Sequence, residues 1–112
     1  MIAVAILGLG SIGLRHAYNL TILGAQVTGF DPDAERRALA EAEGFKTTTE
    51  RGAALDGAAA VVIASPNRFH LEDLEAAAAA DCHVLAEKPL AHTDEGLEDI
   101  LGDFESRGLV VF

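Results

Sequence analysis

The chain has 112 residues, half of them apolar, and it carries a formal net charge of −10. A chain of this length fits one domain with a sizeable core. The excess of acidic residues argues against nucleic acid as a partner, because neutralising a phosphate backbone requires clustered Lys and Arg. The longest apolar stretches fall far short of the ~18–20 residues that span a bilayer. We therefore expect a soluble, cytoplasmic protein with no membrane partner, and its single cysteine, Cys82, excludes an internal disulfide bond.

Short apolar runs alternate with helical patterns along the whole chain. The unbroken apolar run at residues 3–7 is typical of a parallel strand that is covered on both faces. Apolar residues then recur at helical spacing over residues 11–23, and Gly24 provides the stop. Further strands are predicted at 25–30, 45–48, 58–64, 82–86 and 109–112, and further helices at 33–43, 50–55, 71–80 and 93–107. Six strands alternating with five helices predict a single α/β domain with a doubly wound parallel sheet.

A glycine-rich turn joins the first predicted strand to the first predicted helix. Gly8, Gly10 and Gly13 form the pattern G-x-G-x-x-G in the strand-turn-helix context of a dinucleotide site. Gly8 permits the tight turn, Gly10 lets a pyrophosphate approach the backbone, and Gly13 lets the helix pack on the strand. Ser11 and Ile12 begin the helix, where unpaired N–H groups and the helix dipole favour a phosphate. These five residues are candidate cofactor-binding residues.

Asp31 ends the second predicted strand, 18 residues after Gly13, near the spacing expected of an acid that binds the ribose of a dinucleotide. A carboxylate there accepts hydrogen bonds from the ribose hydroxyls of NAD and repels the 2′-phosphate of NADP. We therefore expect NAD as cofactor, with NADP less favoured. Arg36 and Arg37 are close enough in sequence to reach a 2′-phosphate, but we expect them on a solvated helix surface. The alternative interpretation makes the glycines turn formers and Asp31 an acid at a helix start.

Four segments together resemble the N-terminal part of the Gfo/Idh/MocA oxidoreductases. They are GLGSIGLRH at 8–16, GFDPDAERR at 29–37, VVIASPNRFH at 61–70 and AEKPL at 86–90. The resemblance covers essentially the whole chain and implies that residues 1–112 form an NAD(P)-binding Rossmann domain. In that family a larger α/β domain follows and carries much of the substrate pocket. We expect this C-terminal substrate domain to be absent here, and catalysis by the chain alone to be incomplete.

The resemblance assigns roles to the Glu87-Lys88-Pro89 element that follows the fifth predicted strand. Ligands of parallel α/β sheets bind beyond the carboxyl ends of the strands, so these residues would border the nicotinamide. By resemblance, Lys88 is the catalytic residue that hydrogen-bonds the reacting hydroxyl or carbonyl of a sugar, a cyclitol or a related substrate. Glu87 helps to position it, and both residues contact the cofactor. The alternative interpretation is a surface ion pair beside a turn proline.

Polar residues also follow the fourth predicted strand, at the same edge of the sheet. Ser65, Pro66 and Asn67 resemble the family's loop that touches the ribose and nicotinamide side of the cofactor. His70 is a further cofactor-binding candidate, and orienting this loop is a role that we favour for it over proton transfer. His16 is expected to be a packed or capping residue, and His83 and His92 have no Cys, His or carboxylate partner at metal-ligand spacing, so no metal site is expected.

Three functional classes remain open. The first is an NAD-dependent oxidoreductase of which this chain is the nucleotide domain. The second is a module that holds or senses a dinucleotide without turnover, or a subunit that another chain completes. The third is an S-adenosylmethionine enzyme, which would also use a glycine-rich turn, but the Glu-Lys-Pro element counts against it.

The last predicted strand, residues 109–112, is apolar and contains neither lysine nor proline. In the strand order 3-2-1-4-5-6 it lies at one edge of the sheet, where unpaired backbone groups favour association. We therefore expect a homodimer or a larger assembly.

Overall fold

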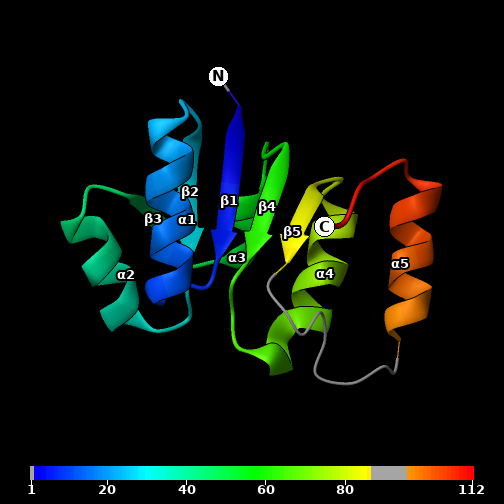
Figure 1. Cartoon of the computed structure of the whole chain (residues 1–112). Helices are drawn as coiled ribbons and strands as arrows, with labels where there is room; N and C mark the ends of the chain where they lie inside the picture. Colours follow the sequence, from blue (N-terminus) through cyan, green and yellow to red (C-terminus); the bar gives the residue numbers. More distant parts are fainter. Residues whose placement is uncertain (1, 87–95) are drawn as a thin grey trace.

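A computed structural model describes residues 2–86 and 96–112 of the chain (Figure 1). The strands are β1 (Ala3–Leu7), β2 (Gln26–Phe30), β3 (Lys46–Thr48), β4 (Ala60–Ile63) and β5 (His83–Ala86). The helices are α1 (Ser11–Ile22), α2 (Ala34–Ala42), α3 (Arg51–Leu55), α4 (His70–Ala79) and α5 (Leu97–Ser106), with a short 3-10 helix, η1 (Asn67–Phe69), before α4.

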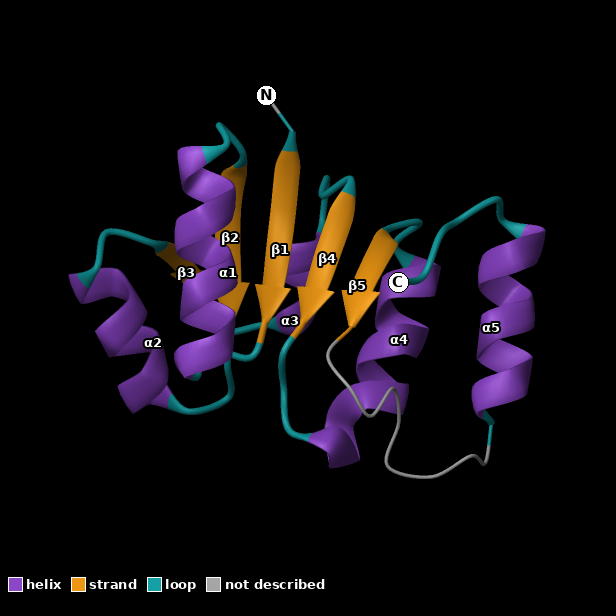
Figure 2. Ribbon diagram, viewed as in Figure 1, coloured by secondary structure: helices purple, strands orange, loops and turns teal. Residues whose placement is uncertain are grey.

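The five strands form one parallel sheet in the order β3-β2-β1-β4-β5 (Figure 2). The chain moves outward from β1 in one direction through β2 and β3, then returns to the other side of β1 for β4 and β5. The strand order therefore reverses between β1 and β4, and the carboxyl ends of all strands lie at one edge. This arrangement confirms the predicted doubly wound α/β fold, which is a Rossmann fold.

Helices cover both faces of the sheet, and alternate side chains of the strands fill two apolar layers. On one face Leu7 of β1 and Ile63 of β4 pack with side chains from α3, α4 and α5. On the other face Ile6 of β1 and Val62 of β4 pack with side chains from α1 and α2. Because both faces are buried, the central strands are apolar without interruption, as the sequence predicts for parallel strands.

The predicted sixth strand is shorter than expected. Residues 110–112 run parallel to β5, but with the described residues they form a single bridge, between Val111 and Val84. The Val84 amide donates to the Val110 carbonyl, and the Phe112 amide donates to the Val84 carbonyl, both at 2.8 Å. The segment thus occupies the predicted sixth position in the sheet.

Element boundaries differ from the predictions mainly at helix ends. The first helix ends at Ile22, because Leu23 serves as its C-cap and Gly24 follows with a φ of +94°. The last helix begins at Leu97, later than predicted, because Gly96 precedes it as a left-handed N-cap with a φ of +80°. The predicted start at residue 93 lies outside the described residues. Among the described residues, none of the helices combines the length and the apolar character that crossing a membrane requires.

Candidate functional site

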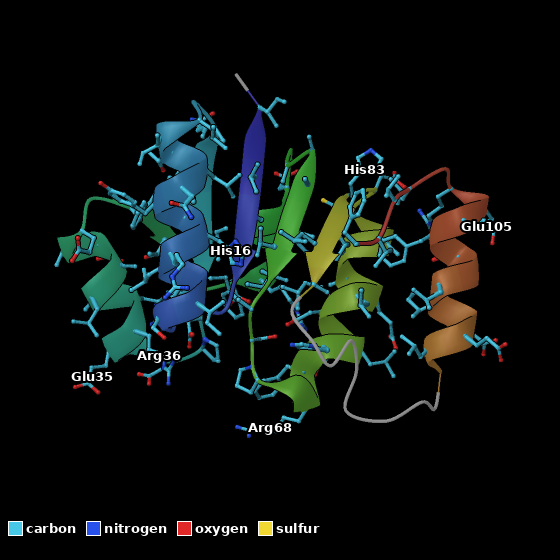
Figure 3. The ribbon with its side chains drawn as sticks, viewed as in Figure 1. His16, Glu35, Arg36, Arg68, His83 and Glu105 are labelled. Atoms are coloured by element: carbon cyan, nitrogen blue, oxygen red, sulfur yellow. The ribbon has the colours of Figure 1, made fainter. Side chains whose placement is uncertain are left out.

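A cavity of about 410 Å³ lies at the edge of the sheet where the strands end. The residues around it come from β1, β2, the loop after β4, and the first turns of α2, α3 and α4. They are Leu7, Gly8, Phe30, Asp31, Pro32, Asp33, Arg36, Arg51, Ser65, Pro66, Arg68, Phe69, Glu72 and Asp73. Figure 3 shows Arg36 and Arg68 at this end of the molecule, whereas His83 lies at the opposite end. The cavity occupies the position at which open α/β sheets bind ligands, beside the reversal of strand order.

The first glycine of the turn lies directly against the loop after β4. Gly8 has a φ of +101°, and its amide donates to the Phe30 carbonyl at 2.8 Å. A Cβ at this position would lie 2.5 Å from the Ser65 nitrogen, so no side chain fits. A Cβ at Gly13 would lie 1.8 Å from the Gly8 carbonyl oxygen. These two glycines therefore allow the turn itself to close against β4 and α1.

Gly10 differs from these two glycines, because a Cβ there would meet a side chain and no backbone atom. It is the N-cap of α1, with an extended backbone and no side-chain capping hydrogen bond. Ser11 and Ile12 follow it as exposed residues at the start of the helix. A Cβ at Gly10 would meet only the guanidinium of Arg36, with Nη1 at 2.6 Å. Although the Arg36 side chain is half exposed, it lies over Gly10 and lines the cavity, where we had expected only a solvated helix surface.

Asp31 is only 6% exposed and joins the glycine turn to the start of α2. One carboxylate oxygen accepts a hydrogen bond from the Leu9 amide at 2.9 Å, and the other accepts one from the Asp33 amide at 2.9 Å. Arg37 donates to the Asp31 carbonyl oxygen at 2.7 Å. Each carboxylate oxygen can accept a further hydrogen bond. The residue thus orders the glycine turn and still borders the cavity.

The loop after β4 contributes Ser65 and Pro66 to the cavity wall. His70 is 1% exposed, and its Nε2 donates to the Ser65 carbonyl oxygen at 2.7 Å. The buried imidazole therefore holds the backbone of this loop. Asn67 begins η1, but its side chain lies outside the described residues.

Sequence reasoning missed a charged cluster in the cavity wall. Asp73 is 3% exposed and accepts hydrogen bonds from Arg51 Nη1 at 2.7 Å and from Ser65 Oγ at 2.5 Å. Burial lowers the pKa of Arg51, but the hydrogen bonds to Asp73 and Glu72 outweigh that effect, so its pKa is raised. The buried stripe of α4 contains a signal for this cluster, because Asp73 falls among its apolar positions. The stripe consists of His70, Asp73, Leu74, Ala77 and Ala78.

The remaining part of the predicted site is the Glu87-Lys88-Pro89 element. Glu87, Lys88 and Pro89 lie outside the described residues. The structure does describe Ala86, the last residue of β5, which is in register with Ile63 of β4. Within the described part of the chain, no group of three or more His, Cys, Asp or Glu side chains is placed to hold a metal ion.

The geometry of the cavity fits a dinucleotide. The uncapped start of α1 at Gly10, next to the cavity-lining Gly8 turn, suits a pyrophosphate, since backbone N–H groups and the helix dipole favour an anion there. Among the described residues, Arg36, Arg51 and Arg68 are the basic residues that line the cavity. The same wall carries four carboxylates, those of Asp31, Asp33, Glu72 and Asp73, and Arg51 is paired with two of them.

Comparison with known proteins agrees with this geometry. Residues 2–112 match the Gfo/Idh/MocA family, described as an oxidoreductase family with an NAD-binding Rossmann fold. The chain is 42% identical over 103 residues to an inositol 2-dehydrogenase of Streptomyces avermitilis, covering 86% of this chain and 30% of that protein.

Solved structures show the same relationship. The UDP-N-acetylglucosamine 3-dehydrogenase GnnA of Acidithiobacillus ferrooxidans superposes with a TM-score of 0.89 at 29% identity, over 98% of this chain and 37% of that one. The WlbA dehydrogenase of Bordetella pertussis, solved with NADH and UDP-GlcNAcA, superposes with a TM-score of 0.85 at 26% identity, over 96% of this chain and 34% of that one.

The chain spans about a third of the length of these relatives. The shared part contains the glycine turn, the acid after β2 and the loop after β4, which together surround the cavity. The chain therefore belongs to the Gfo/Idh/MocA oxidoreductase family and is an NAD-binding Rossmann domain of that family.

Proposed function

We propose that the chain binds the cofactor of a dehydrogenase that moves a hydride between NAD and a hydroxyl or carbonyl of a sugar, a cyclitol or a related compound. The observation that carries this proposal is the cavity lined by Gly8, Asp31 and Ser65, in a domain that is 42% identical to part of an inositol 2-dehydrogenase. Bound NAD supplies the hydride chemistry, and the protein orients the reacting groups. Residues 1–112 act as one nucleotide domain in this proposal.

A second candidate function is a module that holds a dinucleotide without turnover, or a subunit that another chain completes. It rests on the same cavity, which would hold the dinucleotide in either function. In the main proposal, the substrate groups come from a second domain, in the same polypeptide or in another chain. For both candidate functions we place the protein in the cytoplasm, where thiols are kept reduced. The single cysteine, Cys82, is a free, buried thiol.

A substitution in the glycine turn tests cofactor binding, because its effects on binding and on folding can be measured separately. Gly10→Val should abolish the rise in melting temperature that NADH gives the wild-type chain, because the new side chain occupies the place of the pyrophosphate. The fold should survive, since the added Cβ meets only the flexible end of Arg36. Thermal shift measures binding, and circular dichroism measures the fold.

Gly102→Val is the matched control, because a Cβ at Gly102 on α5 meets no atom within 4 Å. This variant should keep the NADH shift. A folded Gly10→Val protein that still binds NADH would show that the pyrophosphate lies elsewhere, and a wild-type chain without any shift at millimolar NADH would end the proposal.

Asp31 and Arg36 should set the preference for NADH over NADPH in opposite directions. Asp31→Ala removes a carboxylate that repels a 2′-phosphate, so the ratio of the two dissociation constants should move toward one. The variant should also lose about 1–3 kcal/mol of stability, because the buried Leu9 amide loses its acceptor.

Arg36→Gln should weaken the binding of NADPH more than the binding of NADH. Fluorescence titration of the wild type and both variants with NADH and NADPH, well below the melting temperature, provides the six dissociation constants. An unchanged ratio in Asp31→Ala would exclude ribose contact.

Lys88 is the proposed catalytic residue, with Glu87 as its positioning partner. The proposal stands on the sequence, in which these residues directly follow Ala86 at the end of β5. A lysine there would hydrogen-bond the reacting oxygen and stabilise the charge that develops on it. We expect no turnover of polyols or sugars by the 112-residue chain alone.

A chimaera tests Lys88 directly. The chain would replace the matching part of the Streptomyces avermitilis inositol 2-dehydrogenase, to which it is 42% identical. With inositol and NAD, Lys88→Ala should lower kcat by roughly 10²–10⁴-fold, with a much smaller effect on the dissociation constant of NADH. An active chimaera whose kcat does not respond to Lys88→Ala would remove the residue from the chemistry.

We also propose that the isolated chain forms a homodimer through an apolar strip on β5 and the segment after α5. Leu85, Val110 and Phe112 are 43%, 44% and 78% exposed. Since Val84 and Val111 point into the core, these three side chains lie on the opposite face, which no helix among the described residues covers at β5 (Figure 2). An exposed apolar patch at a sheet edge favours pairing with a second copy.

Sedimentation at tens of micromolar protein tests this association. The wild-type chain should sediment as a dimer or larger species, and Val110→Lys should convert it to a monomer by placing a charge in the strip. Leu39→Lys, on the exposed side of α2, is the control and should leave the assembly intact. A monomeric wild-type chain would refute the proposal.

A further inference from the structure

A buried carboxylate stands at the wall of the cavity without a role in the binding scheme described so far. Asp73 lies in the first turn of α4 and is 3% exposed. A buried charge is costly unless it is paired and hydrogen-bonded. What surrounds Asp73 therefore indicates what the residue does.

Asp73 joins three segments that are distant in sequence. Its Oδ1 accepts from Arg51 at the start of α3, and its Oδ2 accepts from the hydroxyl of Ser65 at the end of β4. Arg51 is held from a second side, because its Nη2 donates to Glu72 Oε1 at 3.2 Å. Arg51, Ser65 and Asp73 all line the cavity.

This pairing decides how Ser65 can bind a ligand. An ionised carboxylate only accepts hydrogen bonds, so the Ser65 hydroxyl must direct its proton to Asp73. The lone pairs of Ser65 Oγ that remain can then only accept. The Ser65 carbonyl is held in turn by His70, and the Ser65 backbone lies against Gly8. Ser65 is thus fixed through its side chain and its backbone before any ligand arrives.

We propose that Asp73, held in place by Arg51, is a positioning residue that presents the Ser65 hydroxyl to the dinucleotide as a hydrogen-bond acceptor. Ser65 then pairs with a donor on the ligand, such as a ribose hydroxyl or an amide N–H, and not with a phosphate oxygen. This inference rests on the proposed function, since it assumes that the dinucleotide occupies this cavity.

A double-mutant cycle on NADH binding tests the proposal. The chain contains no tryptophan, so NADH fluorescence can be followed without interference from protein tryptophan. Asp73→Asn and Ser65→Ala should each weaken NADH by about tenfold, and the double variant by no more than either single change, because Asp73 acts through Ser65. A purely structural Asp73 would give additive effects, which would overturn the proposal.

Arg51 provides a second test if Asp73→Asn does not fold. Arg51→Gln should weaken NADH binding, and Arg51→Lys should restore part of the affinity because it keeps the charge that faces Asp73. Arg107→Gln is the matched control. Arg107 also pairs with two carboxylates, those of Asp81 and Asp103, but it does not line the cavity. Its loss should leave the dissociation constant unchanged.

The outcomes separate the two claims. A wild-type chain that does not bind NADH would reject the proposed function and this inference with it. A wild-type chain that binds NADH, with equal affinity in folded Arg51→Gln and Ser65→Ala proteins, would reject the inference alone.

The donor on the ligand is identified with reduced deamino-NAD and 3-acetylpyridine-NAD, which lack the adenine amino group and the nicotinamide amide respectively. If one of these groups is the partner of Ser65, the analogue that lacks it should bind the wild type and Ser65→Ala with the same dissociation constant. If both analogues bind Ser65→Ala more weakly than the wild type, the partner is a ribose hydroxyl.

Discussion

The close approach of two loops at the carboxyl edge of the sheet is the constraint on which the site depends. Gly8 leaves β1 so near to the loop after β4 that even a Cβ would lie 2.5 Å from the Ser65 nitrogen. The parallel register of β1 and β4 brings Leu7 beside Ile63, and the next residues of both strands must therefore meet. With glycine at this point the loops touch without obstruction. The cavity opens beside that contact, where the strand order reverses.

Two buried carboxylates organise the loops on either side of this contact, and they do so with different partners. Asp31 accepts from the backbone amides of Leu9 and Asp33, and thereby fixes the glycine turn and the start of α2. Asp73 accepts from the side chains of Arg51 and Ser65, and thereby fixes the loop after β4. In both cases the hydrogen bonds offset the cost of burying the charge. The cavity thus has a wall that is held in place without a ligand.

Much of the fold was predictable because its signals are local. Short apolar runs predicted the strands, and Gly24 after the first helical pattern predicted where α1 ends. The sixth strand was harder, since 109–112 contains the apolar pattern of a strand but forms only one bridge to β5. Strand length depends on pairing with a neighbour, and a sequence pattern does not contain that information.

The sequence by itself determined the glycine turn, the acid after β2 and the polar loop after β4, because each depends on residue type and on distance along the chain. Only the tertiary structure decided that Arg51 and Asp73 pair, since they are 22 residues apart and meet through the packing of α3 and α4 at one edge of the sheet. It also decided that Arg36 lies over Gly10, because α2 returns to the start of α1 only once β2 has paired with β1. Ion pairs between distant segments have no sequence period, so folding alone brings their partners together.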